Sequence, residues 1–156
     1  MNFTPSSGSS TNLRMRIGPP KLIPGELEAC FLVLKELRTS LTLEEFRQIY
    51  SEARRRDQYT LITAFEDGRC LAVMGYRVLY DFIHGKHLYI DDLVVTEAHR
   101  SRGLGKRLLE HAETFASEQN CTGLRLCTGT TASHAQKFYL AQGWEARAIV
   151  FKKGSR

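Results

Sequence analysis

The stretch AHRSRGLGKRLLEHA, residues 98–112, decides how the rest of the chain is interpreted. It places basic side chains around two closely spaced glycines, Gly103 and Gly105, just before an apolar helical pattern begins. The basic residues are Arg100, Arg102, Lys106 and Arg107. Glycine lets the backbone approach a ligand closely, and the free N–H groups of a helix start point at the same spot. The stretch therefore predicts an anion site, and its several charges suit a pyrophosphate better than a carboxylate.

Two common phosphate-binding motifs do not match this stretch. A Walker loop ends in Gly-Lys-Ser or Gly-Lys-Thr, whereas Arg107 follows Gly105 and Lys106 here. A Rossmann fingerprint needs a third glycine where Leu108 stands, and it needs a parallel strand unit rather than antiparallel strands. The pattern that remains is Arg100-x-x-Gly103-x-Gly105.

The surrounding sequence predicts one α+β domain. The chain has 156 residues, of which 42% are hydrophobic and 25% charged, as is typical of a single compact domain. Apolar spacing predicts one helix after Pro24-Gly25 and a second after the capping-box residue Thr42. Three antiparallel strands should follow, with reversals at Asp67-Gly68 and Gly85-Lys86.

The remaining elements complete a sheet with helices packed on it. A clear amphipathic helix begins near Leu104, and we expect a short strand in residues 123–129. A helix follows in 133–142, and WEARAIVFKK, residues 144–153, should form a last strand. Residues 1–18, rich in Ser, Thr, Asn and Gly, should be a flexible tail, so the domain spans residues 19–156.

Composition limits the expected partners. No signal-peptide core or spanning segment is visible, so we expect a cytoplasmic protein with no membrane partner. The net charge of +5 permits an anionic ligand. The basic run 54–56 ends a helix, where cations complement the dipole, so we expect no nucleic acid partner. The cysteines lack the paired spacing of a zinc site, so we expect reduced cysteines and no metal.

Three motifs in order resemble the GCN5-related N-acetyltransferase (GNAT) superfamily. They are the pattern Arg100-x-x-Gly103-x-Gly105, the strand YIDDLVV just before it, and HAQKFYLAQGW some thirty residues later. The last is similar to the family's AxxFYxxxGF segment at Ala135, Phe138, Tyr139 and Gly143. The resemblance covers roughly residues 20–152. It implies the GNAT fold, a central mixed and mostly antiparallel sheet flanked by helices, and acetyl transfer from acetyl-CoA directly to a primary amine.

The resemblance also implies which residues hold acetyl-CoA. The pyrophosphate would lie on the loop formed by Arg100, Ser101, Arg102, Gly103, Leu104, Gly105 and Lys106. The backbone of Leu93, Val94 and Val95 would pair with the pantetheine arm as an added strand does. Many relatives carry Asn where Ala132 stands, so the hydroxyl of Thr131 or Ser133 would have to replace that contact.

The candidate catalytic residues are Tyr139 and Asp91. Tyr139 matches the family's general-acid tyrosine, which protonates the departing thiolate. Asp91 matches the acidic residue of polyamine and diamine acetyltransferases, and simple alternation puts it on one strand face with Leu93 and Val95. Ordinary carboxyl groups are far more acidic than alkylammonium ions, so Asp91 would act through water or by placing the amine electrostatically. Asp92 is the alternative carboxylate, with a structural role as our first expectation.

The acceptor and the assembly stay open at this level. The amine could be a small molecule, a polyamine-like compound or a protein amine, including lysine, and the donor could be a longer acyl-CoA. A non-catalytic acyl-CoA-binding module is the alternative of another class, although it would need neither Tyr139 nor Asp91. Dimers are common in the family, and the last expected strand could pair across a homodimer interface.

Overall fold

The computed structural model describes residues 15–154, and these form a mixed five-stranded sheet in the order β1-β2-β3-β4-β5. The strands are β1 (Met15–Gly18), β2 (Thr60–Glu66), β3 (Arg69–Asp81), β4 (Gly85–Val95) and β5 (Leu124–Leu126). Strands β1 to β4 pair antiparallel in sequence order, and β5 is parallel to β4. The predicted α+β class and the three-stranded meander are therefore confirmed.

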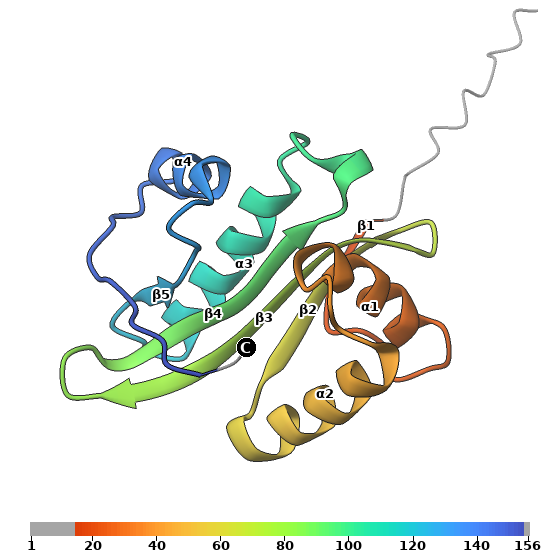
Figure 1. The fold of residues 1–156 in the computed structure, drawn as a ribbon, viewed down its shortest axis with the longest axis horizontal. Helices are drawn as coiled ribbons and strands as arrows, with labels where there is room; N and C mark the ends of the chain where they lie inside the picture. Colours follow the sequence, from red (N-terminus) through yellow and green to blue (C-terminus); the bar gives the residue numbers. More distant parts are fainter. Residues whose placement is uncertain (1–14, 155–156) are drawn as a thin grey trace, which may run out of the picture.

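Helices cover both faces of this sheet (Figure 1). They are α1 (Glu26–Leu37), α2 (Leu43–Asp57), α3 (Leu104–Glu118) and α4 (Ser133–Ala141). Helices α1 and α2 lie against one face, and α3 lies along the other. No helix among residues 15–154 has the length and the apolar run that crossing a bilayer requires.

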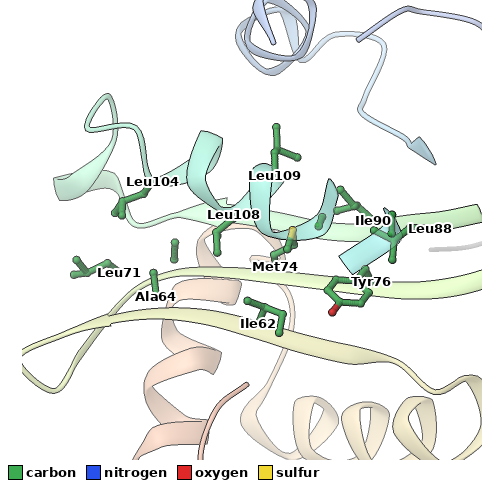
Figure 2. Close-up of a cluster of buried hydrophobic side chains, with 13 residues drawn as sticks. Ile62, Ala64, Leu71, Met74, Tyr76, Leu88, Ile90, Leu104, Leu108 and Leu109 are labelled. Atoms are coloured by element: carbon green, nitrogen blue, oxygen red, sulfur yellow. The ribbon is translucent and has the colours of Figure 1, made fainter. Parts of the chain in front are cut away.

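Each face of the sheet has its own hydrophobic core. The core under α3 joins Leu104, Leu108 and Leu109 to strand residues such as Met74 and Ile90 (Figure 2). The core under α1 and α2 contains buried residues from both helices and from β2, β3 and β4. Its members are Cys30, Phe31, Val33, Leu34, Phe46, Leu61, Phe65, Val73 and Val94. The core that a strand residue's side chain joins therefore identifies the face of the sheet on which that residue lies.

Local signals predicted one helix start and one of the two strand reversals correctly. Thr42 caps α2, accepting a hydrogen bond from the Glu45 N–H at 3.2 Å while Glu45 bonds the Thr42 N–H. Asp67 and Gly68 turn with φ angles of 49° and 77°, as a tight hairpin requires. The second reversal was predicted at Gly85-Lys86 but occupies residues 82–84 instead, because Asp81 Oδ1 accepts from the N–H groups of Ile83 and His84 at 2.9 and 2.6 Å.

The expectations for the two ends of the chain need correction. Residues 15–18, expected in the tail, form β1 along β2, and the rest of the tail lies outside the described residues. The strand expected in 144–153 is not formed. A strand there needs a partner edge, and β5 offers only three residues. Ile149, Val150 and Phe151 remain 76%, 67% and 92% exposed.

A β-bulge in β4 overturns the simple alternation expected around Asp91. Gly75 of β3 pairs with Asp92, whereas the next residue, Tyr76, pairs with Ile90, so Asp91 is an extra residue on β4. Leu93 and Val95 therefore share the α3 face with Ile90, and the Asp92 side chain joins the α1 and α2 face. The expected grouping of Asp91 with Leu93 and Val95 was wrong because one residue was added to the strand.

The bulge is packed tightly against Tyr59, the residue just before β2. A Cβ atom on Gly75 would lie 1.6 Å from the Tyr59 hydroxyl oxygen and 2.2 Å from its Cζ. Only a glycine leaves room for this ring, whose hydroxyl donates to Asp92 Oδ2 at 2.9 Å. Burial, the largest effect, and the neighbouring carboxylates raise the pKa of Tyr59 far above its usual range, so it remains a donor.

Gly75→Ala should therefore destabilise the fold by displacing Tyr59 and breaking its bond to Asp92. We expect the free energy of unfolding to fall by about 2 to 4 kcal/mol, the sum of overpacking and a lost hydrogen bond. Gly18→Ala is the matched control, because a Cβ there meets no atom within 4 Å. Urea denaturation checks both variants, and equal losses in the two would contradict this account of the bulge.

Candidate active site

Strand β4 runs beyond its partner β5. The parallel pairing covers Leu88, Tyr89 and Ile90 of β4 and ends at the pair Ile90 and Leu126. β4 continues to Val95, so residues 91–95 have no strand on that side among the described residues. Backbone groups left without a strand partner can bind an extended ligand as an added strand. The residues predicted to hold the pantetheine arm lie on this free edge.

The loop after β4 leads its backbone into α3 through two left-handed residues. Ser101 and Gly103 have φ angles of 63° and 78°, and a Cβ on Gly103 would meet no atom within 4 Å. Helices α1 and α2 carry acidic residues in their first turns and a glutamate bonded to the cap backbone, whereas α3 has neither. The first N–H groups of α3 thus have no side-chain cap and lie beside the exposed basic residues Arg102 and Lys106, as an anion site requires.

Glu36, near the end of α1, holds the start of this loop. Its carboxylate accepts from the Thr96 hydroxyl at 2.6 Å and from the Glu97 N–H at 3.0 Å. Arg100 also reaches Glu36, at 3.4 Å, and donates from Nε to the Val95 carbonyl at 3.1 Å. Arg100 is therefore tied to the end of β4 and to α1, and its side chain is still half-exposed.

Some of the other predicted loop residues are exposed to solvent, and the rest pack against other parts of the protein. Ser101, Arg102, Gly103 and Lys106 are exposed. The Leu104 side chain is 4% exposed in the α3 core, so only its backbone N–H can reach a ligand. A Cβ on Gly105 would lie 3.1 Å from Cζ of Phe138. The lack of a side chain at Gly105 therefore leaves room for the Phe138 ring of α4, in addition to allowing a ligand to approach the backbone.

Tyr139 lies on α4 over the α3 core, the same core that receives Leu93 and Val95. Its ring packs edge-on against Phe138 and Trp144, with centroids 5.3 and 5.9 Å away. Burial raises the pKa of Tyr139 above its usual value, and no described residue hydrogen-bonds its hydroxyl. The phenol is therefore fixed in place, protonated at neutral pH and able to donate.

The two aspartates of β4 are both engaged by arginines. Arg77 of β3 donates to Asp91 from Nε and Nη2 at 2.8 and 2.7 Å, a bidentate pair. Arg38, just after α1, donates to Asp92 Oδ1 at 3.0 and 2.8 Å and to the Asp91 carbonyl at 3.2 Å. The hydrogen bond with Asp91 raises the pKa of Arg77 further. These bonds hold both carboxylates at the bulge, next to the end of the β5 pairing.

A cavity of about 330 Å³ opens on the α1 and α2 side of the bulge. Its wall includes Leu34, Phe46, Tyr50, Tyr59, Arg38 and Asp92. The ring of Tyr50 stacks on Phe46 and meets Tyr59 edge-on, so the aromatic wall is ordered. A largely apolar cavity whose wall includes one carboxylate, bonded to Arg38, suits a ligand that has an apolar body and a polar or cationic end.

Sequence reasoning missed four residues that build this site. Glu36, Arg38, Tyr59 and Arg77 meet the loop or the aspartates only through the fold. The sequence could have pointed to Arg77, because a charged residue in the middle of a mostly apolar strand needs a partner. The other three lie at helix or strand ends, where polar residues are ordinary. Cys127, just after β5, accepts a hydrogen bond from the Tyr89 hydroxyl at 2.8 Å.

The chain resembles known acetyltransferases in both sequence and structure. Residues 26–144 match the model of the acetyltransferase (GNAT) family. The chain is 30% identical over 122 residues to the uncharacterised N-acetyltransferase YhdJ of Bacillus subtilis, covering 78% of this chain and 86% of that protein. It is 27% identical over 77 residues to the thialysine N-epsilon-acetyltransferase of Bos taurus, covering 49% of this chain and 45% of that protein.

Solved structures share the fold. An aminoglycoside N-acetyltransferase, AAC(6')-Iy, in complex with CoA superposes with a TM-score of 0.76 at 20% identity, covering 90% of this chain and 95% of that one. The glucosamine-6-phosphate N-acetyltransferase of Arabidopsis thaliana gives 0.71 at 22% identity, covering 90% and 98%. The chain belongs to the acetyltransferase (GNAT) family and is an acetyl-CoA-dependent N-acetyltransferase.

Proposed function

We propose that the protein transfers the acetyl group of acetyl-CoA directly to a primary amine bound in the cavity between α1, α2 and β4. The observation that carries the proposal is that β4 separates from β5 after Ile90. The separated part of β4 leads to the glycine loop, residues 100–106, and contains Asp92, which lines the cavity. A thioester lying in the separation would have the α3 face on one side and the acceptor cavity on the other. Donor and acceptor would meet there without an acyl-enzyme intermediate.

The cofactor would be held by backbone groups at two places. The N–H groups of the first turn of α3 and the exposed Arg102 and Lys106 would bind the pyrophosphate, supported by the charge of Arg100. The backbone of residues 93–95 would pair with the pantetheine amides. The side chains of Leu93, Val94 and Val95 pack into the two cores, so only the backbone groups that do not pair with β3 would take this role.

Tyr139 would act as the general acid. Its raised pKa keeps the phenol protonated through neutral and mildly alkaline pH, when the departing thiolate must receive a proton. The contacts with Phe138 and Trp144 favour one orientation of the ring. Because α4 also packs on Gly105, the acid and the pyrophosphate loop would keep a constant separation.

The aspartate pair would place the amine. Both oxygens of Asp91 already accept from Arg77, so this carboxylate would act through its remaining lone pairs and a water molecule rather than as an isolated base. Asp92 lines the cavity and would orient the cationic form of an approaching amine, while Arg38 and Tyr59 hold it. The thialysine acetyltransferase relative and the aromatic wall of the cavity favour a small alkylamine as acceptor.

The proposal is tested by thiol release from acetyl-CoA against polyamines, amino acids, aminoglycosides and a lysine peptide, comparing the parent with Tyr139→Phe. We expect turnover with at least one amine class. Tyr139→Phe should lower kcat about 100-fold, because the acid is lost, while the KM for acetyl-CoA stays unchanged. Tyr80→Phe, an exposed tyrosine on the β3–β4 hairpin, is the matched control and should behave as the parent does.

The pH dependence adds a second readout. A free amine becomes more abundant as pH rises, and the raised pKa of Tyr139 means that its acid form persists, so the parent's rate should not fall up to mildly alkaline pH. Equal kcat values for parent and Tyr139→Phe across pH would remove Tyr139 from this role. Tight acetyl-CoA binding without turnover on any amine would instead favour a non-catalytic acyl-CoA-binding module.

Gly103→Asp should block acetyl-CoA binding more than Gly103→Asn does. Both side chains tolerate the left-handed backbone and have nearly the same volume, so their difference isolates the charge placed beside the pyrophosphate. We expect the Kd to be about 30-fold higher for the aspartate variant than for the asparagine variant, which corresponds to about 2 kcal/mol of repulsion. Isothermal titration measures both constants, and equal values would move the pyrophosphate away from this loop.

A further inference from the structure

A second cluster of ligand-type side chains lies at the β3–β4 hairpin, at the other end of β4 from the glycine loop (Figure 1). It consists of Asp81, His84 and His87, whose ligand atoms all lie within 4.8 Å of one another. We propose that these three residues bind a divalent transition-metal cation of the zinc type. The spacing of the cysteines predicts no metal site, whereas this cluster uses histidines that the hairpin turn brings together.

The strongest support for a metal site is the buried side chain of His87. Its side chain is almost fully buried, with 1% of the residue exposed, and Nδ1 lies 3.0 Å from the Gly85 carbonyl. A carbonyl can only accept, so Nδ1 holds a proton, and in the neutral ring Nε2 then presents its lone pair. Nε2 has no hydrogen-bond partner and lies 3.7 Å from Asp81 Oδ2. A buried acceptor without a partner is costly, and a cation between these two atoms would satisfy it.

The geometry needs only small movements to become a coordination site. His84 Nδ1 lies 2.9 Å from Asp81 Oδ1, close to the spacing of about 3.4 Å that ligand atoms have around a tetrahedral zinc ion. The backbone N–H groups of Ile83 and His84 hold the Asp81 carboxylate in place, and the Gly85 carbonyl orients the ring of His87. Such outer contacts are the ones that orient metal ligands in proteins.

The surroundings leave room for further ligands but also contain a competing cation. A cavity of about 380 Å³ lined by His84, His87 and Thr122 adjoins the cluster, so water can complete the coordination shell. Arg125 of β5 lies 3.4 Å from Asp81 Oδ2, where its charge partly neutralises the carboxylate and would oppose the metal. Arg125 would turn toward Tyr89, which it already contacts, when a metal binds.

The experiment uses the tag-free chain stripped with a chelator and titrated with Zn²⁺ by calorimetry. We expect one Zn²⁺ per chain, a Kd at least tenfold higher in His84→Gln, and an unchanged Kd in the matched control His111→Gln on α3. Arg125→Leu should bind more tightly than the parent, because it removes the competing charge. Circular dichroism of each variant checks that the fold is kept.

Any one of three results would overturn the proposal. The first is no binding of Zn²⁺ at 0.1 mM, which is about the weakest affinity that a site of this kind would show. The second is an equal affinity for Zn²⁺ in the parent and in His84→Gln. The third is loss of Zn²⁺ binding in a Cys127→Ser variant, because that loss would assign the metal to a thiolate. Cys127 is chosen because, of the chain's four cysteines, it is the exposed one. Asp81→Asn gives an independent check, since its amide oxygen keeps the turn bonds but loses the charge, and it should weaken binding as His84→Gln does.

Discussion

Strand β4 loses its partner β5 after the pair Ile90 and Leu126, and the backbone of residues 91–95 must find hydrogen bonds elsewhere. On the β3 side the bulge at Asp91 keeps the pairing while it changes which side chains face each core. On the β5 side no other strand of residues 15–154 covers this edge, which lies beside the basic start of α3. A chain with a straight, fully paired β4 would have neither a place for an extended cofactor arm nor a carboxylate facing the α1 and α2 cavity.

The bulge is held by polar contacts from three directions. Arg77 from β3, Arg38 from the end of α1 and Tyr59 from the start of β2 all bond to the two aspartates. Partly buried carboxylates without such partners would be costly, so the network stabilises the one conformation in which β4 leaves β5. Glu36 does the same for the next segment, tying Thr96, Glu97 and Arg100 to α1. The candidate donor and acceptor sites are thus linked through a single helix.

The sequence predicted what local physical chemistry determines. The capping box at Thr42, the turn at Asp67 and Gly68 and the apolar stripe of α3 depend on neighbours in the chain, and all three are found. The bulge was missed because an inserted strand residue depends on the packing of Tyr59 over Gly75, a residue on another strand. The strand expected in 144–153 failed for a similar reason, since its pattern suits a strand but the short β5 offers it little to pair with. The family motifs predict roles for the glycine loop and Tyr139, whereas nothing in them points to Glu36, Arg38 or Arg77.

Hydrogen exchange of the unmodified protein, with and without acetyl-CoA, tests the central claim most directly. The account predicts that acetyl-CoA slows exchange in two segments, the backbone amides of residues 93–95 on the free edge of β4 and those of residues 104–106 at the start of α3. The β2–β3 turn at Asp67 and Gly68, which takes no part in the site, should exchange at the same rate in both conditions. Binding of acetyl-CoA with no protection in either segment would contradict the claim that the separation of β4 from β5 is the cofactor site.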